Sequence, residues 1–125
     1  MSDGHRATRV LGALNDFFSG FLPAYAEGCA PDAAALPYIT YPLTVPEALG
    51  EASFYARVWF SGAGFGEAAA VVDAIDAAIG PGCCLPVEGG AVWLYKEEGF
   101  ARFVPSAADE RVKCAYLGLK VAACV

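Results

Sequence analysis

Residues 52–61 alternate between two kinds of side chain, and this pattern constrains the fold more than any other stretch of the chain. Successive side chains of a β-strand point to opposite faces, so the stretch predicts a half-buried strand. One face is purely apolar, with Phe54, Ala56, Val58 and Phe60, whereas the other is aromatic and charged, with Tyr55, Arg57 and Trp59. We expect the apolar face to meet helices at the centre of one small domain.

Two other stretches have the apolar spacing of amphipathic helices. Residues 7–21 repeat large apolar side chains at this spacing, and Gly20 and Pro23 mark their end. Residues 67–79 repeat it again and stop at Gly80-Pro81-Gly82, a helix-ending combination. Together with the strand, these helices predict a core that contains Phe17, Phe21, Phe54, Val58, Val72, Ile75 and Ile79.

The first half of the chain also contains less regular segments. Residues 1–6 are expected to form a disordered tail, and residues 22–35 are expected to form a loop or a short extra turn. Residues 38–45 predict a strand. Pro42 lies within that strand and lacks the N–H group that a central strand donates, so we expect an edge strand or a bulge there.

The second half of the chain is predicted to be β-structure. Residues 111–125 are mostly apolar on both faces, which is typical of a strand at the centre of a sheet or in an oligomer. The preceding segments are expected to be strands over 84–87, 91–95 and 100–104, a hairpin turn over 96–99 and a polar loop over 105–110. The prediction is therefore a single α+β domain over residues 7–125, with two helices packed on one face of a mainly antiparallel sheet.

Charge and hydropathy limit the classes of partner. The 125 residues contain 8 Lys and Arg against 14 Asp and Glu, a net charge of −6, and there is no basic run that could grip nucleic acid phosphates. Every apolar run is shorter than the ~20 residues that a membrane-spanning helix needs. The polar N-terminus has no signal-peptide core, so we expect synthesis in the cytoplasm. Hydrophobic residues make up 57% of the chain, and part of this surplus is available for a protein partner.

The sequence offers little that could carry chemistry. It has five cysteines without a C-x-x-C pair, and one histidine, His5, which lies in the expected tail. The glycines at 62, 64 and 66 do not match the dinucleotide-binding pattern, because Glu67 occupies the position of its third glycine. We expect no catalytic residues, no bound metal and no cofactor, with the cysteines as buried thiols in a reducing compartment.

Several functions stay open at this point. The aromatic and charged face of strand 52–61 is either a subunit interface or an ordinary solvated face. A small-molecule-binding α+β domain would need convergent polar groups, for which the candidates are Tyr55, Arg57, Tyr95, Arg102 and Tyr116. A thiol enzyme would have to use Cys83 or Cys84.

A family resemblance adds a further indication. The order of helix, two strands, helix and an antiparallel set resembles that of the tail-terminator, or tail-completion, proteins of long-tailed bacteriophages and prophages. The resemblance spans roughly residues 8–122 and includes the minor tail and head–tail joining proteins of prophages of Gram-positive bacteria. The segments that carry it are residues 36–41, 56–59, 72–79, 90–95 and 112–117. They are structural motifs, and none is a catalytic signature.

The resemblance implies a structural role in virion assembly. Such a protein forms a homo-oligomeric, hexameric ring that caps the tail tube and helps to join tail to head. Its partners are other copies of itself, the tail-tube protein and the head-connector protein, while DNA passes through an acidic lumen without specific binding and no membrane is involved. The protein is then expected in the cytoplasm of the bacterial host during assembly, and afterwards in the virion tail. A head–tail connector or minor capsid protein of the same phage module is the alternative. Candidate subunit-interface residues are Tyr55, Arg57, Trp59, Tyr116 and Lys120.

Overall fold

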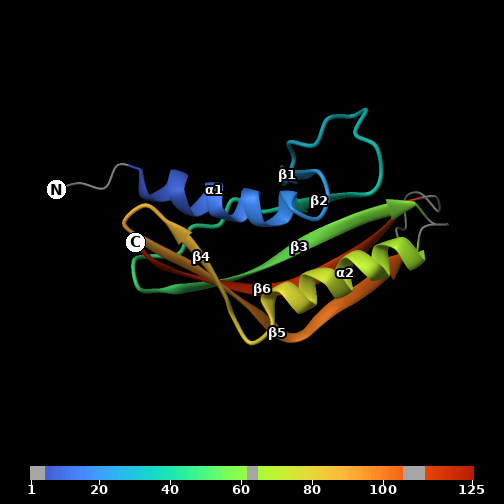
Figure 1. The fold of residues 1–125 in the computed structure, drawn as a ribbon. Coiled ribbons are helices and arrows are strands. Elements are labelled where there is room, and N and C mark those ends of the chain that lie inside the picture. Colours follow the sequence, from blue (N-terminus) through green and yellow to red (C-terminus); the bar gives the residue numbers. More distant parts are fainter. Residues whose placement is uncertain (1–4, 62–64, 106–111) are drawn as a thin grey trace.

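The computed structural model describes residues 5–61, 65–105 and 112–125. Two helices and six strands follow in the order α1 (Arg6–Ser19), β1 (Ala24–Ala26), β2 (Tyr38–Tyr41), β3 (Glu51–Ser61), α2 (Phe65–Ile79), β4 (Cys83–Val87), β5 (Gly90–Pro105) and β6 (Val112–Cys124). The strands form one sheet in the order β1-β2-β3-β6-β5-β4 (Figure 1). Among these pairs, β1 and β2 run parallel and the others are antiparallel. The predicted α+β class with a mainly antiparallel sheet is confirmed.

The sheet has an inner face that packs on the helices and an outer face that does not. On the inner face, Ala56 and Val58 of β3 pair with Leu117 and Ala115 of β6, and all four are fully buried. The helix α2 lies against β3 and β5, and α1 lies against β1 and β4 (Figure 1). Because β1 and β4 are the two edge strands, the contact of one helix with both of them means that the sheet curls around the core.

The core confirms most of the predicted positions. Phe54, Val58, Val72, Ile75 and Ile79 are all buried. The prediction was wrong for the two phenylalanines of the first helix, since Phe17 and Phe21 are only partly buried and Phe18 is fully buried instead. The reason is that α1 buries one position per turn, through Val10, Leu14 and Phe18. Phe17 then packs edge-on against Phe18 and Phe21, with ring centroids 5.4 and 5.2 Å apart.

The predicted hairpin over residues 96–99 is wrong. Residues 90–105 form the single strand β5, which follows β6 along nearly its whole length. A bulge interrupts the pairing between Lys96, which pairs with Leu119, and Ala101, which pairs with Leu117, so residues 97–100 lie opposite Gly118 alone. Gly99 has a φ of 73°, a backbone conformation that glycine adopts without steric cost. Gly99, which suggested a turn, therefore forms part of a bulge, and β5 continues in the same direction beyond it.

Two further boundaries differ from the sequence prediction. Residues 22–35 contain the short strand β1, which runs parallel to β2, and β1 is too short to show an alternating pattern. The strand β2 ends at Tyr41, whereas the prediction extended it to residue 45. Pro42 explains the early end, because the proline has no N–H group to continue the pairing.

The last strand has the predicted central position, since β6 pairs with β3 on one side and β5 on the other. At the other end of the chain, α1 begins at Arg6, and residues 1–4 of the expected tail lie outside the described residues. The glycine-rich residues 62–64 and residues 106–110 of the expected polar loop lie outside them as well. Within the described part, neither helix is long and apolar enough to span a membrane.

Candidate functional site

The outer face of the sheet brings the five candidate interface residues onto one surface. Across β3 and β6, Arg57 pairs with Tyr116, and Tyr55 pairs with Gly118. Trp59 lies two positions along β3 from Arg57, and Lys120 is paired with Ser53 further along the same face. The alternation of the sequence thus places these side chains on the face that no helix covers.

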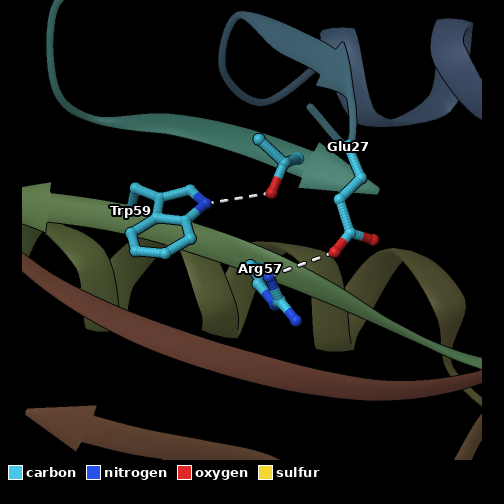
Figure 2. A network of polar contacts seen from close by, with 4 residues as sticks. Glu27, Arg57 and Trp59 are labelled. Carbon is cyan, nitrogen blue, oxygen red and sulfur yellow. Dashed lines mark hydrogen bonds and ion pairs between the residues drawn. The ribbon is translucent and has the colours of Figure 1, made fainter. Parts of the chain in front are cut away.

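Arg57 is held in place by two contacts. One of its terminal nitrogens lies 3.2 Å from Oε1 of Glu27 (Figure 2). Its guanidinium also lies 5.2 Å from the centre of the Tyr116 ring. The ion pair is partly exposed, so it contributes only ~0–1 kcal/mol to stability, and its main effect is to orient the guanidinium. Glu27 follows β1 directly, and its role could not be predicted because no pattern in the sequence indicates that strand.

The neighbouring aromatic side chains are fixed to different degrees. The indole N–H of Trp59 donates a hydrogen bond of 2.9 Å to the hydroxyl of Thr40, so Trp59 has a defined orientation (Figure 2). The Tyr55 side chain is 65% exposed, and its ring centroid lies 6.2 Å from that of Tyr116. This arrangement leaves a large apolar ring in solvent beside positioned polar groups, a combination typical of protein interfaces.

An open groove of about 770 Å³ runs along this outer face. It lies between β3, β6 and the bulge of β5, and its lining consists of Ser53, Phe54, Tyr55, Arg57, Glu97, Glu98, Gly99, Phe100, Arg102, Tyr116 and Gly118. The bulge passes close to β6 at Gly118, where a Cβ atom would lie 3.4 Å from Cβ of Glu97. Sequence reasoning missed the groove because it placed a hairpin turn where the bulge lies.

Four of the five residues that were candidates for a small-molecule site line this groove. Tyr55, Arg57, Arg102 and Tyr116 all line it, whereas Tyr95 lies outside and stacks on Trp93 with a centroid distance of 6.3 Å. The groove volume is in the range of ligand pockets, but most such pockets are apolar and enclosed. This one is open and is lined by two arginines and two glutamates, an arrangement better suited to a charged protein surface than to a small ligand.

Cys114 is buried and Cys83 is partly buried, whereas Cys29, Cys84 and Cys124 are exposed, so the expectation of buried thiols was wrong for these three. Neither Cys83 nor Cys114 has the environment of a catalytic thiol. Burial raises the pKa of Cys83 above its ordinary value, and the neighbouring Cys84 raises it further. A nucleophilic cysteine needs a lowered pKa, so this shift disfavours a thiol enzyme that uses Cys83. Burial also raises the pKa of Cys114 to about 11, although the positive charge of Arg57 acts in the opposite direction. Within the described residues, no group of three or more histidine, cysteine, aspartate or glutamate side chains is placed to hold a metal ion.

Cys114 is expected to resist alkylation as long as the chain is folded. At pH 8, a pKa of about 11 instead of 9.0 makes the reactive thiolate about 100-fold scarcer. Iodoacetamide labelling followed by peptide mass spectrometry measures this reactivity, and the exposed Cys124 of the same strand is the matched control. Because folding raises the pKa of Cys114, the stabilising effect of the neutral buried thiol is present below pH 9 and is lost as the pH rises towards 11. Equal labelling of both cysteines in the folded protein would contradict the burial.

Comparisons with known proteins give one informative result. No protein-family model matches the sequence, and no curated protein matches it. A chain from a structure described as the virion of a native gene transfer agent (GTA) particle superimposes with a TM-score of 0.67 and 14% sequence identity. The match covers 97% of this chain and 98% of that chain. The two chains share a fold. At this level of identity, the likeness extends to the arrangement of helices and strands and no further.

Proposed function

We propose that this chain is a structural protein of a phage-like particle, where it caps the tail tube and helps to join tail to head. The observation that carries the proposal is the likeness to a chain of a gene transfer agent virion over 97% of this chain and 98% of the other. Such coverage means that the whole domain, and not a shared fragment, has the arrangement found in that particle. The tail-terminator resemblance of the sequence supports the more specific role.

The outer face supports a role in assembly. We infer that Tyr55, Arg57, Trp59, Tyr116 and Lys120 form part of a contact between subunits of a hexameric ring. Aromatic residues and arginine are enriched at protein interfaces, and the 65% exposed ring of Tyr55 is a large apolar group that a partner would cover. The net charge of −6 suits a ring whose lumen DNA crosses without binding, because like charges repel.

Deletion of the gene in a host that produces the particles tests the proposed role. Without a tail terminator, tube growth has no stop signal, so we expect overlong tails, and heads that lack joined tails, in negative-stain electron microscopy. Expression of the wild-type gene from a plasmid should restore joined particles of normal tail length. Tails of normal length that fail to join heads would instead indicate a connector, and normal particles after deletion would contradict any role in assembly.

A further inference from the structure

A ring of identical subunits needs two different surfaces on each subunit, since head-to-tail contacts are made between unlike patches. If the proposed ring is correct, the outer sheet face supplies only one of them. The second patch has to lie elsewhere on the domain and has to complement the groove in shape and charge. The helix α2 packs against β3 and β5 (Figure 1). Because this contact is on the inner face of the sheet, the solvent-exposed side of α2 faces away from the groove.

Besides its two glutamates, the groove presents arginine and aromatic side chains. Arg57 on β3 and Arg102 on β5 are both paired with Tyr116 of the strand between them, so the two arginines flank the tyrosine ring. Arg57 forms an ion pair with Glu27, whereas Arg102 forms no ion pair with any other described residue. An exposed guanidinium beside an aromatic ring is well suited to bind a carboxylate of a partner.

The exposed side of α2 has the complementary composition. Between Phe65 and Ile79 the helix contains three acidic residues and no basic one. Asp76 is already bound by Lys96 of β5, which leaves Glu67 and Asp73 exposed without an ion pair among the described residues. Viewed down the helix axis, the exposed side chains that lie between these two acids are the alanines at positions 70, 74 and 77. Such small side chains would allow this face to approach a partner closely.

The spacing of the two acids on α2 is compatible with the spacing of the two arginines in the groove. Glu67 and Asp73 are six positions apart, which corresponds to about 9 Å along the helix axis and about 120° around it, so the two acids border the helix face between them on opposite sides. Arg57 and Arg102 lie on strands separated by β6, which corresponds to about 10 Å across the sheet. A helix laid over the groove could therefore bring its two carboxylates near the two guanidiniums while its alanines cover Tyr116.

We propose that the groove on the outer sheet face binds the exposed side of α2 from a second copy of this chain, with Glu67 and Asp73 of that copy near Arg57 and Arg102. This proposal rests on the ring function above and names the two surfaces that meet in it. The groove glutamates Glu97 and Glu98 belong to the bulge opposite Gly118, two positions along β6 from Tyr116. Their repulsion of the α2 acids favours contact at the two arginines.

A charge-swap experiment in the gene-deletion host tests the contact. Asp73→Arg and Arg102→Glu each place like charges together, and each is expected to lower the yield of joined particles at least about tenfold. The double variant again pairs a positive with a negative side chain, because the two charges have exchanged places. It should recover most of the lost yield, whereas two folding defects would add to each other. Glu88→Arg, an equal charge change on the exposed turn between β4 and β5, is the matched control and should support normal assembly.

The outcomes separate this inference from the proposed function. If the deletion impairs assembly but both single variants complement it fully, the contact is wrong and the function stands. If both single variants fail and the double variant also fails, with unchanged melting temperatures, the groove binds a different partner and the inference is again overturned. If the deletion has no effect on the particles, the proposed function itself is wrong.

Discussion

Replacement of Phe18 by alanine is expected to lower the free energy of unfolding by about 3–5 kcal/mol, the usual range for a fully buried phenylalanine. Its side chain is completely buried and stacks on the ring of Tyr41 with a centroid distance of 5.3 Å. Removal of the ring would leave a cavity between α1 and β2. Tyr41 also donates a hydrogen bond of 2.7 Å to the Asn15 side chain, so this second link between α1 and β2 would lose its support. Urea denaturation followed by circular dichroism measures the loss.

Phe17→Ala is the matched control for this substitution. Phe17 is adjacent in sequence and equal in size, but it is only partly buried, so it should lose roughly half as much stability or less. The comparison also tests which side of α1 faces the core, because the core predicted from the sequence contained Phe17 and not Phe18. A larger loss for Phe17→Ala than for Phe18→Ala would mean that the helix is rotated relative to the structure described above.

The second large effect is expected for Ile75→Ala in α2. Ile75 is fully buried against the inner face, so the substitution should cost about 2–5 kcal/mol of unfolding free energy. Asp73→Ala changes an exposed position of the same helix and should alter stability by no more than about 0.5 kcal/mol. A loss under about 1 kcal/mol for Ile75→Ala, measured by the same denaturation, would show that the predicted buried side of α2 is wrong.

The periodic segments of the sequence predicted most of the fold. The strict alternation in β3 and the helical spacing of α2 each arise because one side of the element is buried, so both elements were placed within a few residues. Prediction failed where a tertiary contact decided the local structure. The stretch over 96–99 looks like a hairpin turn, but its pairing with β6 on both sides of the bulge keeps β5 in one direction. In α1, two adjacent phenylalanines are equivalent in the sequence pattern, and only packing distinguishes Phe18 from Phe17.

Part of the candidate surface could be predicted as well, because side chains alternate between the two faces of a strand. Tyr55, Arg57 and Trp59 share a face by alternation alone, and the pairing with β6 adds Tyr116. The partners that orient them could not be predicted, because Glu27 follows a three-residue strand and Thr40 lies across a strand pair. The groove depends on a bulge, which the residues themselves do not distinguish from a turn.

The place of β6 in the sheet has a consequence for how the protein is made. A ribosome synthesises β3, of 11 residues, and β5, of 16 residues, before the strand that pairs with both of them. Until residues 112–124 emerge, each of these nascent strands has an unpaired backbone edge, which is a template for association with other chains. The period of greatest aggregation risk is therefore the interval between the synthesis of β5 and that of β6. Chaperone supply should raise the soluble yield by covering the unpaired edges during that interval.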